Sequence, residues 1–133
     1  MGEKRTGLIY CATNKINGKM YIGKTTKTLK RRMHEHCATY VLRKPRVHFH
    51  KAIKKYGQDA FSWRVLENNV PVNELADLEM IYIDMFSTYI LGYNMTYGGE
   101  GTFGNYPSEE SKKRCLYRVQ VNILVKKQDR KYA

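Results

Sequence analysis

The sequence lacks any apolar run of about 18 residues and any leader in which charged residues precede an apolar stretch. A membrane-spanning helix and a secretory signal are therefore not expected. We expect a soluble intracellular chain with no membrane partner. Cysteine is also scarce, since the three cysteines are widely spaced and form no Cys-x-x-Cys pair, which predicts free thiols. A zinc site built from Cys37 with the histidine pairs His34 and His36, and His48 and His50, is an alternative, but the fixed cysteine spacing of structural zinc sites is absent.

Repeats and low-complexity segments are also missing, and 133 residues suit one domain with a tail. We place the domain at residues 1–104 and a basic tail at residues 105–133. Acidic residues are few: 24 Lys and Arg face 12 Asp and Glu, which gives a net charge of +12. So large a surplus indicates a polyanionic partner, nucleic acid before anionic membrane.

The charge is unevenly distributed along the chain. Residues 24–56 contain eleven Lys or Arg and a single acid, whereas residues 65–100 contain six acids and no Lys or Arg. We interpret the first segment as facing phosphates and the second as holding a cation. Residues 108–133 are basic again.

Two β-rich segments begin the chain. Residues near 7–13 and 19–25 flank Asn17 and Gly18, a dipeptide that strongly favours a two-residue hairpin turn. Residues 61–67 alternate apolar and polar side chains and predict a third strand. We therefore expect an α+β fold in which helices flank a small, three-stranded, mainly antiparallel sheet.

The two-residue turn sets an expected register for the hairpin. Tyr10 would lie opposite Thr25, and Ala12 opposite Gly23. Tyr10, Tyr21 and Gly23 then share one face of the sheet, which we interpret as the floor of a site. The other face collects the aliphatic side chains Ile9, Cys11, Met20 and Ile22.

Helical periodicity follows the hairpin. Apolar residues recur every four positions across residues 28–42 and predict one helix, with Arg32 and His36 one turn apart beside its apolar stripe. A second helix should bury Phe49 and end at Gly57.

A long third helix is expected, with Asn73 as its N-cap and an apolar face that runs to Met85 and Phe86. Glu79 falls on this face, where a carboxylate is costly unless it is paired or bound to a metal. An ion pair with an arginine is the structural alternative at Glu79.

The tail has two patterns. A basic helix should open at Ser108, and the alternation of apolar residues across 119–125 predicts a final strand.

Residues 18–25 have the spacing of a phosphate-binding loop, a Gly followed by four residues and then Gly-Lys-Thr. Such a loop needs a buried strand directly before its first Gly, whereas polar turn residues precede Gly18 and the strand follows it. ATP binding is therefore not expected. The glycine pattern at 99–104 fails as a dinucleotide fingerprint for the same reason, because no strand precedes it.

The hairpin resembles the two signature strands of the GIY-YIG nucleases. Its first strand carries Leu-Ile-Tyr at residues 8–10, with Gly7 ahead of the triplet, and its second carries Tyr-Ile-Gly at residues 21–23. The first triplet departs from the family pattern by its leucine, but the tyrosine that carries the chemistry is present.

Further elements follow in the family's order. Arg32 and His36 are similar to its Arg-x-x-x-His motif, Glu79 to its helix glutamate, and Asn94 to the asparagine of its Gly-Tyr-Asn turn. The resemblance covers residues 7–100 and is strongest to homing endonucleases.

This resemblance implies a metal-dependent DNA endonuclease. Arg32 would clamp the scissile phosphate. Tyr10 would be the general base, helped to ionise by Lys24, Arg32 and the metal, and His36 would relay its proton or hydrogen-bond the phenol. Glu79 would ligate Mg²⁺ or Mn²⁺. The expected catalytic set is Tyr10, Tyr21, Arg32, His36, Glu79 and Asn94, in which Tyr21 orients water or phosphate and Asn94 holds the metal site or Tyr10.

Basic residues around the site are expected to contact DNA phosphates, with Gly23 allowing close approach of the DNA. The DNA-contacting set is Gly23, Lys24, Lys27, Lys30, Arg31, Arg43, Lys44, Arg46, Lys51, Lys54 and Lys55. A nucleic-acid-binding module on the same fold that does not cleave is the alternative. Monomer and dimer both stay open.

Overall fold

The computed structural model describes residues 5–98 and 107–132. Three strands form one antiparallel sheet in the order β2-β1-β3, so that β1 is central. The strands are β1 (Thr6–Asn14), β2 (Met20–Thr25) and β3 (Phe61–Pro71). The predicted three-stranded fold is confirmed, although β3 continues four residues beyond the predicted end at residue 67.

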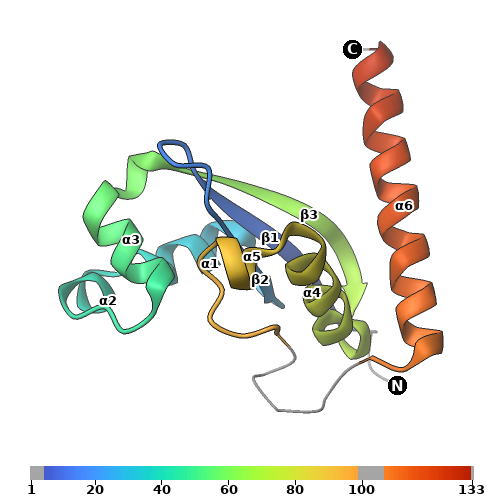
Figure 1. The fold of residues 1–133 in the computed structure, drawn as a ribbon, viewed down its shortest axis with the longest axis horizontal. Helices are drawn as coiled ribbons and strands as arrows, with labels where there is room; N and C mark the ends of the chain where they lie inside the picture. Colours follow the sequence, from blue (N-terminus) through green and yellow to red (C-terminus); the bar gives the residue numbers. More distant parts are fainter. Residues whose placement is uncertain (1–4, 99–106, 133) are drawn as a thin grey trace.

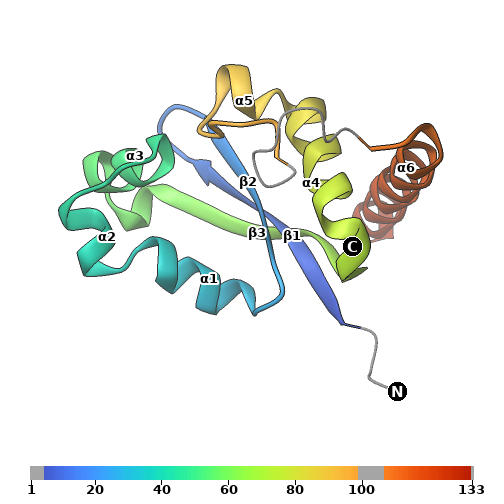
Figure 2. The same cartoon turned by 90° about the horizontal axis from the view of Figure 1, so that it is seen from below.

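Helices cover both faces of the sheet (Figure 2). On one side lie α1 (Leu29–His36), α2 (Thr39–Arg43) and α3 (His48–Tyr56), and the short 3-10 turn η1 (Gln58–Ala60) leads into β3. On the other side lie α4 (Val72–Phe86) and α5 (Thr88–Leu91), and the long α6 (Glu109–Tyr132) stands beside α4 (Figure 1).

The two faces of the sheet bury different side chains. Ile9, Cys11 and Ile22 pack against α4 in an aliphatic core, as predicted. The opposite face is largely aromatic and centres on Phe49, which is fully buried and stacks on Tyr21 at 4.3 Å between ring centroids. The site residues on strands therefore lie in the aromatic layer.

The hairpin register differs from the predicted one by two residues. Tyr10 lies opposite Gly23 rather than Thr25. The turn is longer because the buried Asn14 accepts a hydrogen bond from the Ile16 amide at 2.9 Å and donates to the Tyr93 hydroxyl at 3.0 Å. An even shift leaves every side chain on its predicted face.

The single helix predicted over residues 28–42 is wrong. The helix ends at His36, the backbone is extended at Ala38, and α2 begins at Thr39. The break keeps His36 buried in the aromatic layer while the chain turns toward α3. The apolar periodicity continues through the break, so the sequence pattern could not reveal that the helix ends there.

The long helix α4 also differs in detail. Its N-cap is Pro71, so Asn73 lies within the first turn and does not cap the helix. Met85 is 41% exposed and does not belong to the buried face. Glu79 is buried, as its place on the apolar face predicted.

The final strand predicted over 119–125 is wrong, because this segment belongs to α6. Cys115 and Val119 are buried one helical turn apart in the aliphatic core, and Asn122 donates to the Leu66 carbonyl of β3 at 2.6 Å. Helical packing against α4 and β3 thus overrides the alternation. The boundary predicted at residue 104 lies outside the described residues and stays a prediction. Within the described ranges, no helix has the length and apolarity needed to cross a bilayer.

Candidate active site

Tyr10 lies on the central strand and has no exposed surface. Its ring covers Gly23 on the neighbouring strand, and a Cβ at Gly23 would collide with that ring. The glycine therefore makes room for the phenol. This corrects the prediction that Gly23 lets DNA approach, since Gly23 is itself buried.

The Tyr10 hydroxyl joins two side chains of α1. It lies 2.7 Å from His36 Nε2, and Arg32 Nε donates to it at 3.3 Å. Thr28 caps the helix by accepting from the Arg31 amide at 3.1 Å. One helical turn separates Arg32 from His36, so both reach the same oxygen, and the three residues predicted to act together do meet.

Burial controls the protonation of this cluster. It raises the pKa of Tyr10, with Tyr21 adding to the rise and Arg32 opposing it. Arg32 lowers the pKa of Tyr10, as expected, but burial outweighs it, and Lys24 instead faces Glu79. The expectation that Lys24, Arg32 and a metal together favour the phenolate stays a prediction. Burial, with Arg32 and His50 adding to it, lowers the pKa of His36 to about 3. A neutral phenol thus meets a neutral imidazole.

Tyr21 stacks on Phe49 and lies beside Tyr10, with 6.2 Å between the Tyr10 and Tyr21 ring centroids. Burial, followed by the negative charge of Glu79, raises the pKa of Tyr21. Glu79 also contributes to the raised pKa of Tyr10. The carboxylate on α4 thus acts electrostatically on both tyrosines, although α4 covers the opposite face of the sheet (Figure 2).

Glu79 is 9% exposed, and its Oε1 lies 3.6 Å from Lys24 Nζ. A lysine therefore provides an ion pair for this carboxylate, where an arginine was the expected alternative. Gly98 closes over the carboxylate with a positive φ of 93°, and a Cβ there would lie 3.0 Å from Glu79 Oε1. Glycine at this position therefore avoids a close contact between a side chain and the carboxylate.

The donor set tests which metal the site could hold. Within residues 5–98 and the described part of the tail, no three His, Cys, Asp or Glu side chains gather to bind one ion. Zinc in structural sites needs such a group. Mg²⁺ is commonly bound through one or two carboxylates and keeps several waters, so Glu79 fits Mg²⁺.

Asn94 hydrogen-bonds the backbone of β2. Its Oδ1 accepts from the Ile22 amide at 2.9 Å, and its Nδ2 donates to the Ile22 carbonyl at 2.9 Å. The preceding Tyr93 amide donates to the Met20 carbonyl at 2.9 Å. Asn94 therefore fixes β2, and the expectation that it holds the metal site or Tyr10 stays a prediction.

His50 is a site residue that the sequence did not single out. Its Nε2 lies 2.8 Å from His36 Nδ1, on the side of the imidazole away from Tyr10. The sequence showed it only as part of a zinc alternative. Its signal is the neighbouring Phe49, whose burial turns the start of α3 toward the aromatic layer.

The predicted DNA-contacting residues divide by exposure. Gly23 is buried and Lys24 is half-buried, while the remaining residues are exposed. Lys24, Lys27 and Arg32 line a groove of about 340 Å³ between the end of β2, α1 and the start of α4. Glu35 also lines it and pairs with Lys27 at 3.4 Å. Three cations against one acid make this groove suited to a phosphate.

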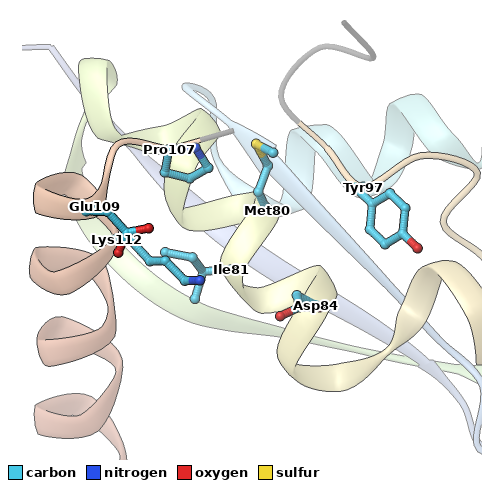
Figure 3. A pocket seen from close by; sticks show the side chains of 7 residues that line it. All are labelled: Met80, Ile81, Asp84, Tyr97, Pro107, Glu109 and Lys112. Carbon is cyan, nitrogen blue, oxygen red and sulfur yellow. The ribbon is translucent and has the colours of Figure 1, made fainter. Parts of the chain in front are cut away.

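A second hollow of about 450 Å³ lies between α4 and the start of α6 (Figure 3). Asp84 and Ile81 of α4 face Glu109 and Lys112 of α6 across it. It contains none of the predicted catalytic residues, so its size does not identify it as the reaction site.

Comparisons with known proteins identify the family and the fold of this domain. Residues 6–94 match the GIY-YIG catalytic domain. Among solved structures, the chain is similar to a variant of the catalytic domain of intron endonuclease I-TevI, with a TM-score of 0.59 and 23% identity over 74% of this chain and 99% of that one. A second structure of the homing endonuclease I-TevI catalytic domain gives a TM-score of 0.57 at 23% identity over 68% of this chain and 98% of that one. At this identity the likeness shows the fold.

Two viral proteins are also similar. Protein 146R of Invertebrate iridescent virus 6, named for an MSV199 domain, is 32% identical over 85 residues, which are 64% of this chain. The uncharacterized protein 019R of the same virus is 36% identical over 83 residues, which are 59% of this chain. The matched region spans only 34% and 29% of these relatives.

Proposed function

Because this chain belongs to the GIY-YIG catalytic domain family, we propose that it is a metal-dependent DNA endonuclease of the homing-endonuclease type. The observation that carries the proposal is the hydrogen-bonded group in which the Tyr10 hydroxyl meets both His36 and Arg32. Hydrolysis of a phosphodiester requires a base and a cation. The Tyr10 phenol would be the base, the His36 imidazole would accept its proton, and the Arg32 guanidinium would be the cation.

The residues divide the work as follows. As the attacking water gives a proton to the Tyr10 oxygen, the Tyr10 proton passes to His36 Nε2, so that no free phenolate has to form between two groups that burial keeps neutral. The water oxygen bonds to phosphorus, one P–O ester bond breaks, and the leaving oxygen takes a proton from solvent. Arg32 Nε stabilises the negative charge that develops on the Tyr10 oxygen, and Arg32 Nη1 lies 3.8 Å from Glu35, which lines the same groove as Arg32 and Lys24.

Glu79 would hold Mg²⁺ or Mn²⁺, which would neutralise charge that develops on the phosphate oxygens. The ion pair with Lys24 holds the carboxylate close to the sheet. Tyr21 would orient water or phosphate beside Tyr10, and Asn94 would act by fixing β2 under both tyrosines.

The DNA would lie across the exposed basic residues of the α1 and α3 side. Lys30 and Arg31 of α1 and Lys51 of α3 are exposed. Their phosphate contacts would give affinity without reading sequence. The basic tail 105–133 would contact DNA separately, because its helix α6 packs beside α4 on the other side of the sheet.

The test is cleavage of supercoiled plasmid by wild type and Glu79→Ala, each with Mg²⁺ and with EDTA. We expect cutting by wild type with Mg²⁺ only, and a loss of about 100-fold or more in Glu79→Ala while DNA retention in a gel-shift assay persists. Asp84→Ala, an exposed acid on the same helix, is the matched control and should cut normally. The ratio of nicked to linear product reports how many strands are cut.

A wild-type protein that retains DNA but cuts no plasmid with any divalent ion would contradict the proposal. That result would support the alternative, a nucleic-acid-binding module on the same fold that does not cleave.

A further inference from the structure

The imidazole of His36 is held on both of its nitrogens. Nε2 lies 2.7 Å from the Tyr10 hydroxyl, and Nδ1 lies 2.8 Å from His50 Nε2. His36 is 4% exposed, and Phe49 packs edge-on against its ring at 5.0 Å between centroids. The ring therefore cannot turn without breaking both hydrogen bonds.

Two directions of donation satisfy this chain of hydrogen bonds, and only one of them leaves His36 able to act as a base. Arg32 has only N–H donors, so the Tyr10 oxygen accepts from Arg32 Nε. In the direction that the proposed reaction uses, the Tyr10 hydroxyl donates its hydrogen to His36 Nε2. A neutral imidazole with a bare Nε2 carries its hydrogen on Nδ1. This Nδ1–H donates to His50 Nε2, which must be unprotonated.

We propose that His50 is a positioning residue of the cleavage site, which holds His36 in the tautomer whose bare Nε2 receives the Tyr10 proton. The inference rests on the proposed function and extends it by one residue. His50 touches neither the phenol nor, in the proposed reaction, the substrate, and it acts through His36.

The positive charge that forms on His36 during the reaction strengthens its hydrogen bond to His50. When the phenol O–H bond breaks and the proton moves to Nε2, His36 becomes an imidazolium. Its Nδ1–H then donates to a neutral acceptor, and a hydrogen bond from a cation is about twice as strong as a neutral one. Burial, with Arg32 adding to it, lowers the pKa of His50 as well, so His50 is a neutral acceptor at neutral pH.

Three substitutions separate positioning from other roles of His50. His50→Gln can place its amide oxygen where Nε2 lies and accept from His36, but it cannot hold a proton at neutral pH. His50→Asn is one bond shorter, and His50→Leu has no acceptor. We expect the single-turnover cleavage rate of His50→Gln to stay within about 3-fold of wild type, and the other two variants to lose about 10- to 100-fold with unchanged DNA affinity.

A second readout does not depend on cleavage. The ¹⁵N chemical shifts of His36 should show a protonated Nδ1 and a bare Nε2 in wild type and in His50→Gln, and a mixture of tautomers in His50→Leu. Thermal unfolding midpoints of the variants confirm that each is folded before its rate is compared.

Three results would overturn the inference: a protonated His36 Nε2 in wild type, a His50→Leu variant that cuts like wild type, or a His50→Gln variant as slow as His50→Leu. Absence of cleavage by wild type would contradict the proposed function instead, and the tautomer measurement would still decide whether His50 positions His36.

Discussion

At the residue scale, the position of Tyr10 depends on the absence of a side chain at Gly23, the residue opposite it. Its ring has room because Gly23 has no side chain, and its hydroxyl is fixed by groups from α1. A phenol without exposed surface on a central strand is oriented by packing as much as by hydrogen bonds. The glycine of the second signature strand is therefore part of the tyrosine's site.

Gly23→Ala should displace the Tyr10 ring, because the added Cβ would collide with it. We expect the free energy of unfolding to fall by about 1–3 kcal/mol, as for other overpacked cores, and cleavage to fall with it. Denaturant unfolding and plasmid cleavage measure the two effects.

The matched control for Gly23→Ala is Gly18→Asn in the hairpin turn. Gly18 has a positive φ of 77°, no described residue other than its chain neighbours lies within 4 Å of the place where a Cβ would stand, and asparagine tolerates such a backbone. Its cleavage rate should match wild type. Equal cleavage by Gly23→Ala and wild type would mean that Tyr10 does not need its present position.

The site residues differ in how far the sequence could predict them. Arg32 and His36 meet Tyr10 as predicted, since helical spacing alone sets them on one face. Gly23 was assigned to DNA because no spacing rule shows which ring lies over a glycine. His50 was missed because its contact depends on the break after α1, which turns α3 toward the site.

At the element scale, the segment after α5 hydrogen-bonds to the outer edge of the sheet. β2 is an edge strand, and its outward-facing backbone at Ile22 is paired with the side chain of Asn94. The same strand carries Tyr21 and Gly23 on one face and Lys24 on the other. Fixing β2 therefore positions groups on both sides of the sheet.

Asn94→Ala should free this strand. The loss of two hydrogen bonds to buried backbone groups should lower the free energy of unfolding by about 1–3 kcal/mol, and the Ile22 amide should exchange its hydrogen faster. Hydrogen exchange followed by NMR measures the second effect at a single residue. Asn73→Ala, at an exposed position in the first turn of α4, is the control and should change neither quantity. An Ile22 amide that stays protected in Asn94→Ala would contradict the assigned role.

Strands and helices were predictable where the sequence pattern of apolar residues follows from burial of one face of the element. The hairpin kept its faces although its turn length was wrong, because burial constrains the parity of the register and not the turn. α6 was misread over residues 119–125 because its alternating apolar residues are mostly exposed, with Val121, Ile123 and Val125 at 39%, 42% and 50%. Only the contact of Val119 with the core reveals the helical period.

At the scale of the whole molecule, α1–α3 and α4 separate opposite charges onto the two sides of the sheet, while the basic α6 stands beside α4. The basic helices α1, α2 and α3 lie on one side of the sheet, and the acid-containing α4 lies on the other (Figure 2). β2 lies at the edge between them and carries Lys24, which pairs with Glu79. A bound DNA backbone on the basic side would therefore reach the carboxylate at the edge of the sheet and not through it.

Removing Lys30, Arg31 and Lys51 together, each replaced by Ala, should weaken DNA binding at low salt. If each contacts one phosphate, the slope of log affinity against log salt should become shallower by about 2 to 3. Replacing Lys15 and Lys19 of the hairpin turn, two exposed cations outside the predicted contact set, should change the slope less. Fluorescence anisotropy over a salt series measures both slopes, and an unchanged slope in the triple variant would place the DNA elsewhere.

The hydrogen bonds that Asn94 makes to the backbone of β2 have a counterpart on β3, since Asn122 of α6 donates to the Leu66 carbonyl. Each outer strand of the sheet thus has a carboxamide from outside the sheet bonded to its backbone. Unpaired outer strands are where proteins aggregate by adding strands from other copies. The two asparagines therefore act against aggregation, and a chain cut before α6 would expose β3 and lose solubility before it lost its catalytic groups.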